Sequence, residues 1–154
     1  MSQPIHVRRA ELKDAVTIAA YNIHMALETE HKRLDPYTVS AGVRNALEDE
    51  GKGIYYVAEV GERVIGQLMI THEWSDWRNG DVWWIQSVYV HKDFRKQGVF
   101  KRLFAEAEAG AKAAGAVMIR LYVETDNAGA QKSYANLGMT MTSYAVMEKP
   151  LAKQ

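Results

Sequence analysis

The chain has 154 residues, 47% of them hydrophobic and 25% charged, which is ordinary for a globular protein and predicts one domain over residues 1–154. Nineteen basic side chains balance nineteen acidic ones, so the net charge favours neither a nucleic-acid nor a membrane partner. The absence of cysteine excludes disulfides, thiolate metal sites and cysteine nucleophiles, and the five histidines lack metal-ligand spacing. The sequence begins without a signal-peptide pattern and has no apolar run that could span a bilayer, so we expect a cytoplasmic protein without a metal.

Ten segments with strand or helix periodicity follow one another in the order β-α-α-β-β-β-α-β-α-β. In chain order they cover residues 5–8, 12–27, 36–47, 54–60, 64–72, 82–90, 97–114, 117–123, 127–137 and 139–148. Asp35 before Pro36 predicts the N-cap of the second helix. Residues 73–81 are expected to form a polar loop. This order predicts a mixed α/β (α+β) domain with helices packed on a largely antiparallel sheet.

Residues 87–103 are the most informative stretch, because a strand ends, a basic loop follows, and Gly98 opens an apolar-periodic helix. The N–H groups and dipole of a helix N-terminus favour an anion, and a glycine lets it approach the backbone closely. Arg95, Lys96 and Lys101 add positive charge around this point. The stretch therefore predicts a phosphate site. The simpler alternative is a helix-start glycine among solvated surface charges.

A second pattern, Asn127-x-x-Ala130-x-x-x-Tyr134, lies on the predicted helix 127–137. Residues seven positions apart share a helix face, so Asn127 and Tyr134 are expected on the same side. Taken alone, these residues favour a structural interpretation, with Asn127 as an N-cap and Tyr134 as a core aromatic.

The stretch 87–103 resembles motif A of the GNAT superfamily, the acyl-CoA-dependent N-acetyltransferases. That motif has Arg or Gln after a strand, then two residues, Gly, one residue, and Gly or Ala. Arg95 and Gly98 match it, whereas Phe100 stands where the second small residue is expected. The Asn–Tyr spacing resembles motif B, and the element order is the GNAT order, so the resemblance covers nearly the whole chain. It implies a GNAT-like central, mostly antiparallel twisted sheet flanked by helices.

The resemblance implies acetyl-CoA as cosubstrate, with its pyrophosphate on the loop amides and its pantetheine arm along the preceding strand. It implies that Tyr134 protonates the departing thiolate and that the N–H of Val88 or Tyr89 donates to the thioester oxygen. The implied coenzyme-binding residues are Val88, Tyr89, Val90, Arg95, Lys96, Gln97, Gly98, Val99, Phe100, Lys101, Asn127 and Tyr134. The ring of Phe100 is expected to point away from the ligand.

Acyl transfer to an amine also needs a base, because only about one part in a thousand of a lysine-like amine is neutral at physiological pH. Many GNAT members carry a glutamate at the position of Gln86, which cannot accept a proton. Glu73 and Glu28 are therefore the leading candidates for the catalytic base. Further candidates are Glu30, His31 and Glu124. Each could equally be an ordinary exposed side chain.

All four tryptophans lie within residues 74–84, mixed with acids. One interpretation is a wall that recognises a cationic amine. The other is a hairpin whose tryptophans pack on the sheet or in a dimer contact. The candidate substrate-binding residues are Glu30, Trp74, Trp77 and Gln86. Strand alternation places Trp83 and Tyr89 on one face and Trp84 on the other, with Trp83 or Trp84 mainly in the core.

The combined prediction is direct transfer of acetyl from acetyl-CoA to a primary amine of a small or amino-acid-like molecule, with a homodimer left open. One alternative is a coenzyme A-binding module with degenerate catalysis, favoured by Gln86 and Phe100. A second is a protein or peptide N-acetyltransferase. A third, a nucleotide-binding domain, is disfavoured because Gly-x-x-x-x-Gly-Lys-Ser/Thr and Gly-x-Gly-x-x-Gly are both absent.

Overall fold

The computed structural model describes residues 3–152 and divides into two units, one up to Tyr122 and one from Val123, which are described separately. The first unit contains a five-stranded sheet in the order β1-β2-β3-β4-β5. Its strands are β1 (His6–Arg9), β2 (Ile54–Val60), β3 (Arg63–Ser75), β4 (Gly80–Val90) and β5 (Met118–Leu121). Strands β1 to β4 pair antiparallel, and β5 pairs parallel to β4. The predicted mixed, mostly antiparallel sheet is confirmed.

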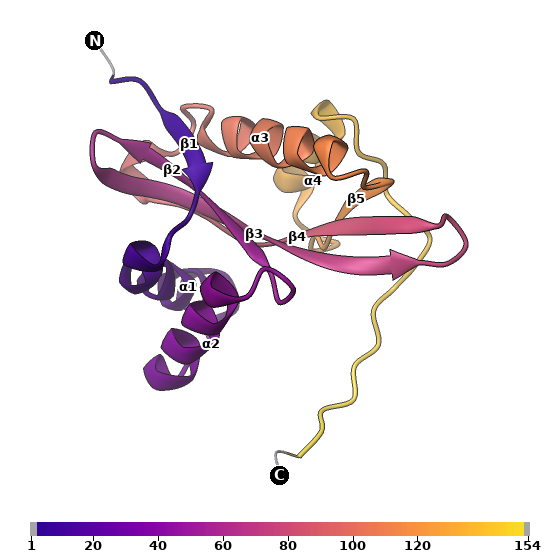
Figure 1. Ribbon diagram of the computed structural model, residues 1–154, viewed down its shortest axis with the longest axis horizontal. Coiled ribbons are helices and arrows are strands. Elements are labelled where there is room, and N and C mark those ends of the chain that lie inside the picture. The colour runs from indigo at the N-terminus through magenta and orange to yellow at the C-terminus, as the bar shows by residue number, and fades with distance from the viewer. Residues whose placement is uncertain (1–2, 153–154) are drawn as a thin grey trace. The chain divides into compact units, whose positions relative to one another are not determined.

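Three α-helices belong to the same unit, and they lie on both faces of its sheet (Figure 1). They are α1 (Ala15–Glu30), which follows the 3-10 turn η1 (Leu12–Asp14), α2 (Pro36–Glu48) and α3 (Val99–Ala113). The predicted cap of α2 is confirmed, because the Thr38 N–H donates to the Asp35 carboxylate at 3.1 Å. Helices α1 and α2 cover one face, and α3 covers the other.

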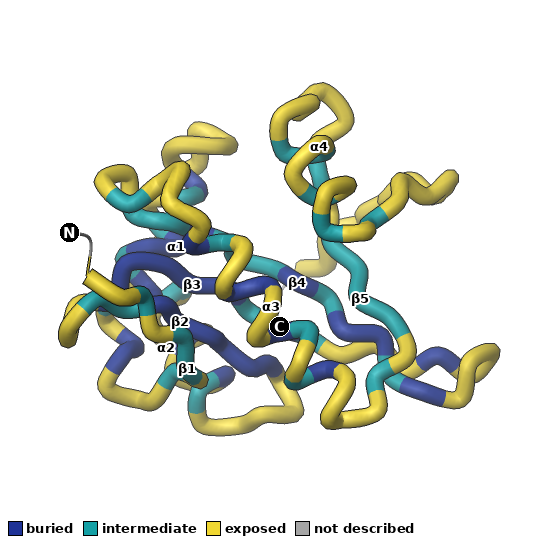
Figure 2. The backbone as a smooth tube through the Cα atoms, turned by 90° about the horizontal axis from the view of Figure 1, so that it is seen from above, coloured by how far each residue is buried: buried dark blue, intermediate teal, exposed yellow. Residues whose placement is uncertain are grey.

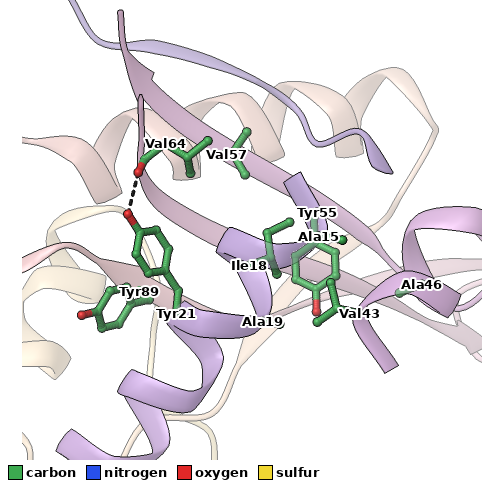
Figure 3. Close-up of a cluster of buried hydrophobic side chains, with 10 residues drawn as sticks. All are labelled: Ala15, Ile18, Ala19, Tyr21, Val43, Ala46, Tyr55, Val57, Val64 and Tyr89. Atoms are coloured by element: carbon green, nitrogen blue, oxygen red, sulfur yellow. Dashed lines mark hydrogen bonds between the residues drawn. The ribbon is translucent and has the colours of Figure 1, made fainter. Parts of the chain in front are cut away.

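The core on the α1/α2 face joins helix and strand side chains (Figure 3). It contains Ala15, Ile18, Ala19, Tyr21, Val43, Ala46, Tyr55, Val57, Val64 and Tyr89. The Tyr21 hydroxyl satisfies its polar end by donating to the Val64 carbonyl. Burial of the central strands is evident in Figure 2, where they are dark blue. This core holds α1 rigidly against β3 and β4, which positions the C-terminal end of α1.

Helix α3 packs on the opposite face through the apolar stripe that its sequence predicts. Val99, Leu103, Ala107 and Ala111 are all buried. Gly110 lies so close to the Tyr56 hydroxyl that a side chain there would collide with it, and the Trp83 ring lies within van der Waals contact of the same position. Trp83 therefore faces α3, and its predicted core position is confirmed.

Strand β4 contains a bulge that the sequence analysis missed. Gln67 of β3 pairs with Tyr89 and Met69 pairs with Gln86, so two β4 residues stand opposite one β3 residue. The extra residue shifts the alternation, and Tyr89 lies 4.9 Å from the Tyr21 ring on the α1 face. The expectation that Trp83 and Tyr89 share a face is wrong for this reason.

The expectation of a polar loop over 73–81 is also wrong, because the β3–β4 ladder extends as far as the pair of Ser75 and Gly80. Only a turn over 76–79 separates them. Backbone pairing sustains this ribbon although its side chains lack apolar alternation. Trp74 and Trp77 are 62% and 88% exposed, so neither packs in the core.

The second unit contains helix α4 (Ala128–Asn136). The strand expected over 139–148 is absent, and no residue of this segment joins a ladder within the described part of the chain. Apolar alternation is insufficient for a strand, because a strand also requires backbone hydrogen-bond partners. The prediction of one domain over 1–154 stays a prediction. Within residues 3–152 no helix is long and apolar enough to cross a membrane.

Candidate functional site

Strand β4 separates from β5 in the middle of the sheet. The parallel ladder joins Val82–Ile85 to Met118–Leu121 and ends there. From Gln86 to Val90, β4 pairs only with β3 among the described residues. The bulge falls in this part of the strand, where Ser87 adopts a left-handed φ of 52°. The free edge can therefore accept an extended ligand as an added strand.

The loop after β4 leads directly into the N-terminus of α3. Lys96 and Gly98 have left-handed φ values of 62° and 79°. The N–H of Arg102 donates to the Gly98 carbonyl at 3.1 Å, and a helix N-terminus directs the N–H groups of its first turn outward along the axis. A side chain at Gly98 would meet nothing within 4 Å. Open space therefore lies beside backbone donors and a positive helix end, an arrangement that suits a phosphate group.

The loop arginine is already held by side chains from other elements. Arg95 forms a 2.9 Å ion pair with Glu28 at the end of α1, and both side chains are 44% exposed. Its Nε donates to the Val90 carbonyl at 2.8 Å, and its guanidinium lies 5.5 Å above the Tyr89 ring. Burial, followed by the nearby Glu28 charge, raises the pKa of Tyr89. The structure thus brings Glu28, a predicted base, to the predicted coenzyme loop.

Glu73, the other predicted base, belongs to a different cluster on β3, β4 and β5. Its carboxylate accepts a 3.1 Å hydrogen bond from the Trp84 indole and lies 3.6 Å from the Arg120 guanidinium. Arg120 also lies 5.9 Å above the Trp84 ring, which packs 4.7 Å from Tyr122. Sequence analysis missed Arg120 and Tyr122, because nothing local links β5 to an acid on β3.

Three further predicted residues have defined surroundings. Gln86, on β4, donates from Nε2 to the Thr71 hydroxyl of β3 at 2.6 Å. Glu30 ends α1 and lies 3.7 Å from Lys32. His31 caps α1 in a left-handed conformation. The structure brings neither Glu30 nor His31 into the Arg95 contacts.

The ring of Phe100 lies 6.1 Å from that of Phe104, one turn further along α3. The expectation that this ring points away from a bound coenzyme stays a prediction. Among residues 3–152 no group of three or more His, Asp or Glu side chains could hold a metal ion.

The second unit contains the other predicted motif. The Asn127 side chain accepts a 3.0 Å hydrogen bond from the Ala130 N–H, so the N-cap interpretation is confirmed. Gln131 donates to the carbonyls of Glu124 and Thr125, which ties the helix to the preceding turn. Burial raises the pKa of Tyr134, so its hydroxyl stays protonated at neutral pH and can act as a proton donor.

A comparison with family models matches residues 18–139 to the acetyltransferase (GNAT) family. The chain belongs to the GNAT acetyltransferase family. A possible acetyltransferase from Clostridium difficile 630 is 42% identical to this GNAT chain, with a TM-score of 0.89 over 97% of this chain and 99% of that one. A comparison with curated proteins gave no significant match.

Two more distant acetyltransferase structures share the fold. A predicted acetyltransferase from Clostridium acetobutylicum with acetyl-CoA is 16% identical, with a TM-score of 0.77 over 95% of this chain and 96% of that one. An aminoglycoside acetyltransferase from an uncultured soil metagenomic sample, in complex with sisomicin, is 12% identical, with a TM-score of 0.75 over 97% of each chain. Family membership agrees with the resemblance that motifs A and B indicate.

Proposed function

We propose that this GNAT protein transfers an acetyl group from acetyl-CoA to a primary amine of a small molecule. One observation carries the proposal: the open edge of β4 leads within a few residues to the left-handed Gly98 at the start of α3. The same short segment thus offers a strand edge for an amide-containing arm and backbone donors for a pyrophosphate. Coenzyme A contains both groups in this order.

The residues that would bind the coenzyme are those of the β4 edge and the loop. Peptide groups from Val88 to Val90 would pair with the pantetheine arm. The N–H groups from Gln97 to Lys101 would surround the pyrophosphate, with charge from Arg95 and Lys96. The Val90 carbonyl accepts a hydrogen bond from Arg95. For the pantetheine arm to take this place, Arg95 would turn toward the phosphate.

Acetyl-CoA supplies the acetyl group as a thioester, which the acceptor amine attacks as its C–N bond forms and the C–S bond breaks. The N–H of Val88 or Tyr89 would stabilise the negative charge on the thioester oxygen. Tyr134 would give its proton to the sulfur. The amine loses a proton to water or to a carboxylate, for which Glu73 and Glu28 are the candidates.

The acceptor is proposed to be a small cationic amine. The exposed indoles of Trp74 and Trp77 and the carboxylates of Glu73 and Glu30 suit an ammonium group before its deprotonation. Gln86 lies on β4 two residues before Val88, its Nε2 donates to the Thr71 hydroxyl, and its carbonyl oxygen would hydrogen-bond the acceptor.

The test is calorimetric titration with acetyl-CoA and with ATP, followed by measurement of free thiol release with small amines, polyamines, amino acids and peptides. We expect binding of acetyl-CoA without binding of ATP, and thiol release with small cationic amines. Thiol release with peptides alone would favour a peptide acceptor. Absence of acetyl-CoA binding would contradict the proposal altogether.

A coenzyme-binding module without efficient catalysis is the second candidate. It is favoured because Gln86 is not a base and both leading carboxylates are paired with arginines. Acetyl-CoA binding without thiol release above the rate of buffer, across the same panel of amines, would support this candidate instead.

The Glu28→Gln variant tests whether Glu28 acts as the base or only holds the Arg95 side chain. We expect a two- to fivefold gain in acetyl-CoA affinity, roughly, because phosphate no longer competes with Glu28 for the guanidinium. Stability should change by less than about 1 kcal/mol, as for other exposed pairs. Glu48→Gln, at the exposed end of α2, is the matched control. A loss of kcat with unchanged acetyl-CoA binding would instead identify Glu28 as the base.

A further inference from the structure

A buried polar cluster lies beside the β4 bulge and is not used by any step above. Gln67, in the middle of β3, has no exposed surface. Its Nε2 donates to the Asn22 Oδ1 of α1 at 2.8 Å and to the Ser87 carbonyl at 3.1 Å. The Asn22 side chain also lies beside the buried Tyr55 hydroxyl, whose pKa it lowers against the larger effect of burial. The cluster thus links α1, β2 and β3 to one peptide group of β4.

The other end of the Gln67 amide is left without a partner. Its Oε1 is buried and accepts no hydrogen bond within the described structure. A rotated amide would direct Oε1 at the Ser87 carbonyl oxygen, so this backbone acceptor determines the orientation of the Gln67 amide. A methionine or leucine would avoid the buried unsatisfied oxygen but would leave the Asn22 and Ser87 acceptors without this donor. The glutamine is thus matched to these two partners, and a buried unpaired oxygen such as its Oε1 is an exception of the kind found at functional sites.

The single β4 carbonyl that Gln67 contacts belongs to the residue with unusual backbone geometry. Ser87 has a φ of 52°, a conformation that costs free energy for any residue except glycine. This residue lies two positions after the last β5 pair, Ile85, and forms the bulge with Val88. The backbone conformation of Ser87 sets the direction of the two peptide groups that follow. These groups carry the N–H of Val88 and the N–H of Tyr89.

We propose that Gln67, anchored by Asn22, is a positioning residue that holds the Ser87 carbonyl and so aims the Val88 and Tyr89 N–H groups at the thioester oxygen. The inference rests on the proposed function for its catalytic part. The hydrogen bond by which Gln67 holds the bulge at Ser87 does not depend on any ligand. A misdirected donor stabilises the transition state less while leaving the distant pyrophosphate contacts in place.

The test is Gln67→Met, which keeps the volume and removes only the polar group. Leu68→Met, an equally buried neighbour on the same strand, is the matched control. Without ligand, we expect amide hydrogen exchange of residues 86–90 to rise by about tenfold in Gln67→Met and to stay unchanged in Leu68→Met. With acetyl-CoA and an active amine, we expect kcat to fall by about tenfold or more while KM for acetyl-CoA changes less than about twofold. Asn22→Ala should shift both readouts in the same direction by a smaller amount.

Unchanged exchange in a folded Gln67→Met would overturn the support of the bulge, whatever the protein catalyses. Faster exchange with unchanged kcat would overturn the positioning role while leaving the structural one. If the wild type transfers acetyl to no amine, the proposed function fails, and the exchange experiment alone still decides whether Gln67 holds the bulge. Should Gln67→Met not fold, which a thermal melt would reveal, Asn22→Ala carries both readouts.

Discussion

Replacing Gly98 with tryptophan is expected to weaken acetyl-CoA binding by about 100-fold, measured by calorimetry. The φ of 79° is strained for any side chain, at about 1–2 kcal/mol. The indole would also occupy the open space next to the first-turn N–H groups of α3. Loss of one or two charge-assisted hydrogen bonds, each about 1.5–3 kcal/mol, accounts for a change of this size.

Gly115→Trp is the matched control, because Gly115 follows the other end of α3, has the same φ of 79° and also has no neighbouring atom within 4 Å. It should lose similar stability and keep full acetyl-CoA affinity. If both variants bind like the wild type, the pyrophosphate does not bind at this loop. If both lose affinity equally, backbone strain and not a blocked site is responsible.

Tyr134→Phe should lower kcat by about 100-fold or more, because the thiolate would leave without a proton. The KM for acetyl-CoA should change little, since the ring and its packing are retained. Tyr144→Phe, at an exposed tyrosine of the same unit, is the control. An unchanged kcat in Tyr134→Phe, with thiol release as the readout, would remove Tyr134 from the mechanism.

The same role predicts a pH dependence. Burial raises the pKa of Tyr134 above the ordinary value of a tyrosine, and the protonated form is the active one. The activity should therefore rise with pH as the acceptor amine loses its proton, and the decline due to Tyr134 should come at a higher pH than the ionisation of an ordinary tyrosine. That decline should disappear in Tyr134→Phe. A decline near neutral pH that this variant retains would belong to another group.

Local patterns were sufficient for several parts of the structure. The cap at Asp35, the strand over 54–60 and the apolar stripe of α3 depend on residues within a few positions of one another. The strand–loop–glycine–helix unit around Gly98 is local in the same sense. For this reason the sequence alone predicts a phosphate site there and shows the resemblance to motif A.

Only the tertiary structure decided which side chains meet across the sheet. Glu28 and Arg95 are 67 residues apart, and Gln67 and Asn22 are 45 apart, so no local period relates them. The bulge at Ser87 was equally invisible, because one extra residue reverses an alternation of period two and moves Tyr89 to the opposite face. The sequence by itself determined the family and the secondary structure on both sides of the loop at Gly98. The partners of the acids, and the shape of β4 next to them, follow from long-range packing that a linear pattern does not contain.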